Sequence, residues 1–125
     1  MLNTILLYIG CGIICVWGIA HIAPTKKMVA GFGKISDENK KIITMEWIAE
    51  GLTLIFLGAL VFLVTFFGGP QESISVVVYW ACAGMLVVMA VLSLFTGAKT
   101  SIIPMKLCPV VKSMTAVLFL LGILL

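Results

Sequence analysis

The sequence has little charge and no arginine at all. Only 10% of its 125 residues are charged, whereas 62% are hydrophobic, and the mean hydropathy is +1.27. A soluble core of this size cannot hide so much apolar surface, so a soluble globular domain is excluded and lipid is the expected solvent. The chain also lacks a basic surface interleaved with aromatic residues, which excludes nucleic acid as an expected partner.

Several kinds of cofactor chemistry are disfavoured because their residues are missing. The four cysteines form no C-x-x-C pair, so the reactive motif of a thiol–disulfide oxidoreductase is absent. The single histidine, His21, cannot ligate a haem from both faces. Cys82, Met85 and Met89 offer soft ligands to Cu(I), but a sulfur stripe at helical spacing is typical of helix packing. We therefore expect no cofactor and no metal ion.

Long hydrophobic runs are what the sequence does have. A helix that crosses the hydrocarbon core of a bilayer needs about 20 apolar residues. Four runs reach that length: Asn3–Ile22, Ile42–Phe67, Ser73–Thr96 and Leu107–Leu125. The sequence therefore predicts an all-α integral membrane protein, a four-helix bundle that forms one domain over residues 1–125. The only long connection is the loop 23–41.

The lysines predict the orientation in the membrane. All eight lie in or beside two connections, the loop 23–41 and the segment that joins the third and fourth runs. Cytoplasmic loops carry an excess of positive charge, so we expect both connections in the cytoplasm and both termini on the other side. The expected location is a bacterial cytoplasmic (inner) membrane. Ser36 is a plausible N-cap, which predicts a second helix of about 30 residues that begins before the membrane.

Ionisable residues inside the runs are the strongest functional signal. Glu46 and Glu50 lie one helical turn apart in the second run, and His21 and Lys112 fall at similar depth in the first and fourth. Placing a charged side chain deep in a bilayer costs at least about 2.5 kcal/mol. Such a side chain therefore usually faces a pocket or a partner. We expect Glu50 to pair with Lys112, because neither has another obvious partner in the spans. Helix-locking ion pairs, with His21 reaching the interface, are the structural alternative.

Each run also has one polar or soft stripe at helical spacing. The four stripes are Gly10, Ile14, Gly18 and His21; Glu46, Glu50, Thr53 and Leu57; Cys82, Met85, Met89, Ser93 and Thr96; and Cys108, Lys112, Thr115, Phe119 and Gly122. The pattern is typical of a bundle whose stripes face inward and whose remaining surface faces lipid. Trp17 and Trp47 lie at the same level. They either wall a pocket or belong to the interfacial aromatic belt.

These residues predict a polar site in the cytoplasmic half of the bundle, with Glu50, Glu46 and His21 as acid–base groups. Lys112, Trp17, Trp47, Thr53, Ser93 and Met89 are the expected ligand-binding residues. The favoured function is binding or processing of a lipid-like or other small hydrophobic ligand. One alternative is an oligomeric, proton-coupled small-molecule transporter or channel. Another is an accessory subunit of a larger membrane complex. The expected partners are membrane lipid, a hydrophobic small molecule, and either further copies of the chain or other subunits.

Overall fold

The computed structural model describes residues 1–125 and is entirely helical. Four helices are long and apolar enough to cross a membrane. They are α1 (Leu2–Ile22), α3 (Asp37–Phe67), α4 (Ser73–Phe95) and α5 (Ile103–Leu124). A short helix α2 (Thr25–Ala30) follows α1, and a 3-10 turn η1 (Gly97–Lys99) follows α4. The all-α prediction with four membrane-length helices is therefore confirmed.

The helix ends follow local signals in the sequence. The side chain of Ser36 caps α3, because its oxygen accepts a hydrogen bond from the backbone N–H of Asn39 at 3.1 Å. Asp37 and Glu38 then occupy the first turn of α3, where negative charge suits the helix dipole. At the other end of α3, Gly69 has a φ of +92° in the turn that leads into α4, a conformation that favours glycine.

The fourth long helix starts earlier than its hydrophobic run. The structure begins α5 at Ile103 rather than at Leu107, with Pro104 in its first turn, where a missing N–H costs nothing. A second proline, Pro109, lies inside α5 without ending it. Neighbouring helices can compensate such an interruption in a membrane helix. As a result, Met105 belongs to a helix and not to a loop.

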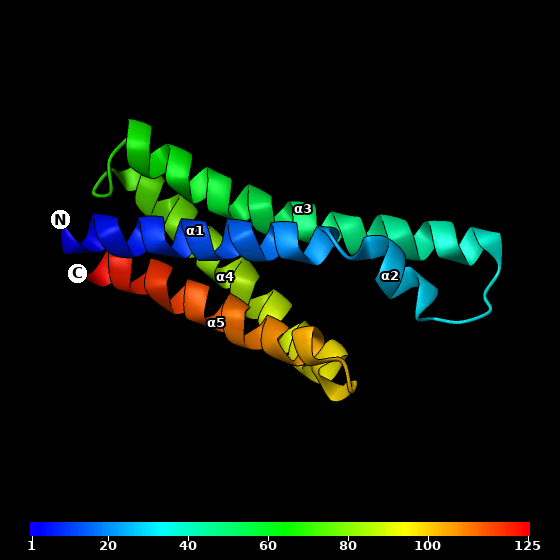
Figure 1. Cartoon of the computed structure of the whole chain (residues 1–125). Helices are drawn as coiled ribbons and strands as arrows, with labels where there is room; N and C mark the ends of the chain where they lie inside the picture. The colour runs from blue at the N-terminus through cyan, green and yellow to red at the C-terminus, as the bar shows by residue number, and fades with distance from the viewer.

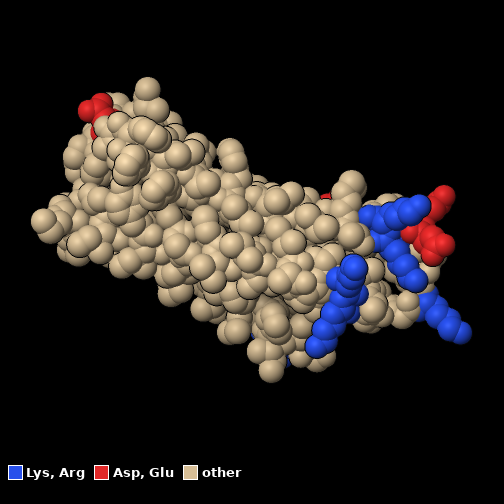
Figure 2. Space-filling model, turned by 45° about the horizontal axis from the view of Figure 1, so that its top comes forward, with Lys and Arg blue, Asp and Glu red and all other residues tan.

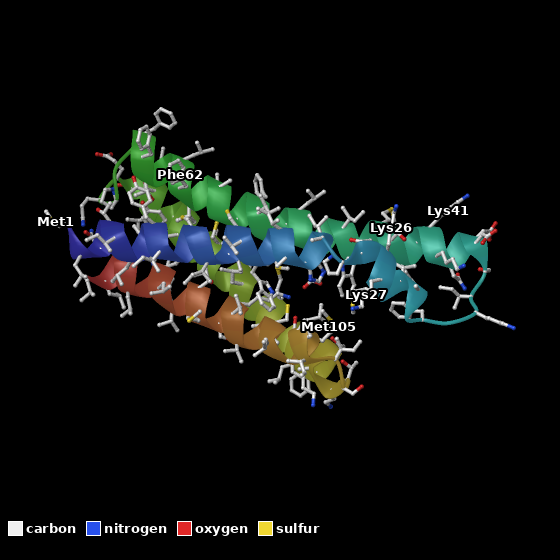
Figure 3. All side chains as sticks on the ribbon, viewed as in Figure 1. Met1, Lys26, Lys27, Lys41, Phe62 and Met105 are labelled. Carbon is white, nitrogen blue, oxygen red and sulfur yellow. The ribbon has the colours of Figure 1, made fainter.

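The chain termini and the lysines lie at opposite ends of the bundle. Figure 1 shows both termini at one end, beside the turn between α3 and α4, and the loop before α3 at the other. On the face shown in Figure 2, the lysine side chains gather at the second end, which we call the lysine end. Met1 and Phe62 mark the first end in Figure 3, and Lys26, Lys27 and Lys41 mark the lysine end. The relative arrangement matches the one that the lysine pattern predicted.

The four long helices do not pack on one another equally. Helix α1 packs on α3 and α5, and α4 packs mainly on α5 and less on α3. In Figure 1, α3 diverges from α4 and α5 toward the lysine end. The hydrophobic core of the bundle includes Leu7, Ile14, Leu54, Leu86 and Phe119. The divergence leaves α3 and α4 apart at the level of Glu50.

Glycines fix the close approach of α1 and α3. A Cβ atom added to Gly51 would lie 2.3 Å from the Ile22 side chain and 2.9 Å from the carbonyl oxygen of Gly18. The two backbones can approach this closely only because neither residue has a side chain, a device common between membrane helices. Gly58, about two turns further along α3, makes a similar contact with α1. This interface sets which face of α3 turns toward the bundle.

The predicted inward stripe of α3 is corrected by this packing. The buried face of α3 consists of Gly51, Leu54, Leu57, Gly58, Val61 and Thr65. Only Leu57 of the predicted stripe is buried; Glu50 and Thr53 are half-buried, and Glu46 is exposed. By contrast, the predicted stripe of α5 is buried over its whole length, from Cys108 to Gly122. In α4 the predicted stripe is buried only at Cys82 and Met89. Its remaining residues, Met85, Ser93 and Thr96, are exposed or half-buried.

Candidate functional site

An ion pair joins α3 to α5 inside the bundle. The ammonium of Lys112 donates to one carboxylate oxygen of Glu50, Oε1, and also to the hydroxyl oxygen of Ser93 at 2.8 Å. The side chain of Lys112 is 1% exposed, so both contacts replace water that the ammonium loses on burial. The pairing of Glu50 with Lys112 that the sequence predicted is present, and Ser93 of α4 joins it.

His21 approaches the same carboxylate from α1. Its Nε2 lies 3.3 Å from the second oxygen of Glu50, Oε2, although the geometry is not that of an aligned hydrogen bond. We therefore treat the contact as electrostatic. The His21 side chain is only 2% exposed, so it lies inside the protein. Glu50 thus bridges a buried ammonium and a buried imidazole, and the cluster takes one residue from each long helix.

Trp47 holds His21 in place. The indole ring lies parallel to the imidazole, with ring centroids 4.2 Å apart and an interplanar angle of 13°. Its Nε1–H donates to the backbone carbonyl oxygen of His21 at 2.6 Å. Both contacts cross from α3 to the last turn of α1. Trp47 therefore contacts the cluster directly.

The glycine contact between α1 and α3 aligns this cluster. Gly18 lies one turn before His21 on α1, and Gly51 directly follows Glu50 on α3. These two glycines bring the backbones of α1 and α3 together. As a result, the imidazole of His21 lies within reach of the Glu50 carboxylate. Any residue that forced the helices apart here would also separate His21 from Glu50.

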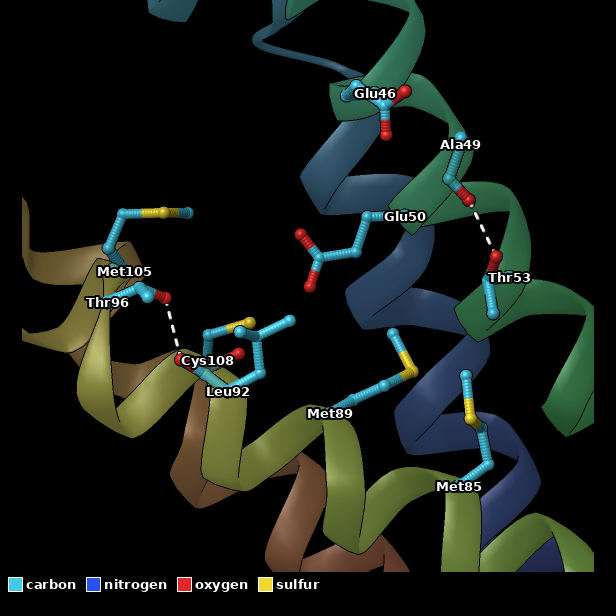
Figure 4. Close-up of a pocket in the computed structure, with 12 residues that line it drawn as sticks. Glu46, Ala49, Glu50, Thr53, Met85, Met89, Leu92, Thr96, Met105 and Cys108 are labelled. Atoms are coloured by element: carbon cyan, nitrogen blue, oxygen red, sulfur yellow. Dashed lines mark hydrogen bonds between the residues drawn. The ribbon is translucent and has the colours of Figure 1, made fainter.

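A pocket of about 490 Å³ opens between α3, α4 and the start of α5. Figure 4 shows the Glu50 carboxylate pointing from α3 into this space, with the thioethers of Met85 and Met89 projecting from α4. We call it the α3–α4 pocket. It is lined by Glu46, Ala49, Glu50, Thr53, Met85, Met89, Leu92, Ser93, Thr96, Gly97, Met105 and Cys108. This volume is in the range of small-molecule sites, roughly 300–1,000 Å³.

The polar groups of the pocket are mostly hydrogen-bond acceptors. Glu50 is 33% exposed, so it is the charged member of the cluster that faces the pocket. Glu46 is exposed and forms no ion pair. The Thr53 hydroxyl donates to the carbonyl oxygen of Ala49, and that of Thr96 to the carbonyl oxygen of Leu92. The pocket therefore presents carboxylate oxygens against walls of methionine, leucine and cysteine.

A second pocket, of about 460 Å³, lies on the other side of the cluster. His21, Trp17 and Trp47 form one wall, and Met105 and Leu107 of α5 contribute to it. Met105 also lines the α3–α4 pocket, so the two spaces share this residue. The indole nitrogen of Trp17 is buried without a hydrogen-bond partner.

The structure brings together most of the residues singled out from the sequence. Glu46, Glu50, Thr53, Met89 and Ser93 line the α3–α4 pocket, and Lys112 supports it from behind. Trp17, His21 and Trp47 line the second pocket. Sequence reasoning left Met105 outside a helix and so missed it. A proline at position 104 was the available signal, since proline favours the first turn of a helix. No group of three histidine, cysteine or acidic residues lies close enough to hold a metal ion.

Comparison with known proteins identifies no relative. No family model, curated protein or solved structure matches the chain. A function is therefore inferred from the chemistry of the pocket and of the cluster behind it.

Proposed function

We propose that this chain is an integral membrane protein that binds a small, lipid-soluble amphiphile in the α3–α4 pocket, with the polar end of the ligand at Glu50. The lysine distribution favours a pocket in the cytoplasmic half of the membrane, and we propose a bacterial cytoplasmic membrane as its location. One observation carries the proposal: Glu50 is the accessible charged group of a cluster whose ammonium and imidazole are buried, and it opens onto a pocket with apolar walls.

The cost of the cluster supports a functional role. Burial of an ion pair is expensive, and apolar residues of similar size often stabilise a fold as well or better. A purely structural pair has no need of an adjoining pocket, whereas a binding site needs a polar group held at a fixed place. Lys112 and His21 hold the Glu50 carboxylate from behind, at Oε1 and Oε2. The arrangement resembles a preorganised anchor for a ligand head group.

The position of the pocket mouth supports a ligand that arrives from the lipid. Two of the lining residues, Met85 and Leu92, are 45% and 63% exposed on the apolar side of α4. In a bilayer that side of the helix contacts acyl chains, so the pocket is accessible from within the membrane. Methionine side chains suit such a ligand, because they are flexible and adapt to irregular apolar shapes.

A pocket-filling variant tests this proposal. We expect Met85→Trp to place an indole in the α3–α4 pocket and to abolish retention of a bound amphiphile. Val88→Trp is the matched control, because Val88 is 63% exposed on the same helix and does not line the pocket. Native mass spectrometry of protein purified in mild detergent provides the measurement. A retained small amphiphile in the wild type and Val88→Trp but not in Met85→Trp supports binding. The same adducts in all three proteins contradict it.

A second candidate function is proton-coupled transport. The observation that favours it is the position of the Glu50–His21 contact, since Glu50 lines one pocket and His21 lines the other. A carboxylate and an imidazole in contact can pass a proton from one pocket to the other. Proteoliposomes loaded with a pH-sensitive dye test this. Proton entry that depends on an added amphiphile and is lost in His21→Gln supports transport, and entry that is absent or unaffected by the substitution contradicts it.

A further inference from the structure

The charges around the α3–α4 pocket do not balance. Two carboxylates, Glu46 and Glu50, line it, and no lysine does. Lys112 compensates Glu50 from behind, but no cation lies within ion-pair distance of Glu46. Lys112 is the only lysine that pairs with these two carboxylates, so the charge of Glu46 has no partner. A carboxylate without a partner attracts a cation.

The two carboxylates are placed to contact one small head group together. They are four residues apart on α3, so their Cβ atoms are about 5–6 Å apart on the same side of the helix. Figure 4 shows both side chains on the part of α3 that borders the pocket. A single ammonium near the pocket mouth can therefore contact both carboxylates.

The remaining lining residues distinguish between kinds of cation. None of the twelve is aromatic. Quaternary ammonium groups are typically recognised by aromatic cages, through cation–π attraction. This pocket instead offers carboxylate oxygens, which accept hydrogen bonds from N–H groups. Charge-assisted hydrogen bonds of that kind are the strong ones, so the pocket favours an amine that carries protons.

We propose that the ligand of the α3–α4 pocket is a lipophilic primary amine in its protonated form, bound with its ammonium between Glu46 and Glu50 and its apolar tail along Met85, Met89 and Leu92. This inference rests on the proposed function, because it assigns a ligand class to the same pocket. The ammonium supplies the one positive charge that the pocket lacks. The tail leaves through the exposed side of α4 into the surrounding lipid.

Competition binding tests this assignment. The protein is reconstituted in phosphatidylcholine nanodiscs, which carry no net surface charge, and binding of tritiated hexadecylamine is measured. Hexadecanol, hexadecanoate and hexadecyltrimethylammonium are the competitors, because they share the tail and differ in the head group. We expect hexadecylamine to compete at least about tenfold better than the other three, as the loss of a charge-assisted hydrogen bond implies.

One variant and its control test whether the pocket causes the preference for hexadecylamine. Glu46→Gln is expected to reduce hexadecylamine affinity by about tenfold. Glu38→Gln is the matched control, since Glu38 is an exposed carboxylate on the same helix that does not line the pocket. We expect hexadecylamine affinity in the control to equal that of the wild type. Equal losses in both variants overturn the assignment.

The outcomes separate this inference from the function on which it rests. If all four amphiphiles compete equally, and Met85→Trp abolishes their binding, the amine assignment fails while the binding function stands. If the quaternary competitor matches hexadecylamine, the role assigned to N–H donors is wrong. If no amphiphile shows binding that Met85→Trp removes, both proposals fail.

Discussion

Removing Glu50 from the Glu50–Lys112 pair should lower the stability of the protein more than removing Lys112. Glu50→Leu leaves an ammonium whose side chain is 1% exposed and whose remaining partner is the Ser93 hydroxyl. Breaking a buried pair in this way costs about 4 kcal/mol. Lys112→Met leaves a carboxylate that is 33% exposed to the pocket and 3.3 Å from His21. Partial exposure and the neighbouring imidazole reduce the cost there to about 2 kcal/mol.

The double variant should recover most of the loss. With both charges gone, neither is left buried without a partner, and we expect a net cost of about 1 kcal/mol or less. The coupling free energy between the two sites is then at least about 5 kcal/mol, above the roughly 0.5–3 kcal/mol of most contacting residues, because each single variant leaves a charge without its partner. Reversible unfolding in mixed detergent micelles, followed by circular dichroism, gives the free energy of unfolding for all four proteins.

Two results would refute this reasoning. Additive losses in the double variant would mean that Glu50 and Lys112 do not interact in the folded protein. A larger loss in Lys112→Met than in Glu50→Leu would mean that the carboxylate is the more deeply buried partner. In that case Glu50 would not be the group of the cluster that faces the pocket.

Three further predictions concern helix packing, a second polar contact and orientation. Gly51→Ala should cost about 1–3 kcal/mol of unfolding free energy, because its Cβ has no space against α1, whereas Gly84→Ala, with no atom within 4 Å, should change little; the same detergent titration checks both. Tyr79→Phe should cost about 1 kcal/mol in that assay, because it removes the hydrogen bond of 2.7 Å to Thr65 while Thr65 keeps its own backbone carbonyl partner. An impermeant maleimide added outside intact cells should label Gln71→Cys and not Lys34→Cys, and the reverse pattern would contradict the proposed orientation.

Much of the architecture was predictable because it depends on local signals. The four membrane-length helices follow from hydrophobic runs, and the start of α3 follows from Ser36 and the acidic residues after it. The pairing of Glu50 with Lys112 was predictable because buried opposite charges at similar depth have few other partners. These features need no knowledge of how the helices rotate about their own axes.

Helix rotation is where sequence reasoning failed. The stripe of Glu46, Glu50, Thr53 and Leu57 was expected to face the interior, but the glycine contacts turn a different face of α3 toward α1. Gly18, Gly51 and Gly58 carried the missing signal, since small residues mark close helix contacts in membranes. The contacts of Trp47 were not predictable either. The sequence placed Trp47 at the level of the site, but only the structure shows its ring stacked on His21 and its indole N–H donated to the His21 carbonyl oxygen.

The most direct test of the central claim maps where a lipid-soluble ligand binds. A diazirine-bearing long-chain amphiphile is photo-crosslinked to the protein in nanodiscs, and the modified residues are located by peptide mass spectrometry. The proposed function predicts adducts concentrated on the α3 segment 46–53 and on the α4 segment 85–95, reduced by excess unlabelled amphiphile and by Met85→Trp. Adducts spread evenly over the lipid-facing residues of all four long helices, and unchanged in Met85→Trp, would contradict it.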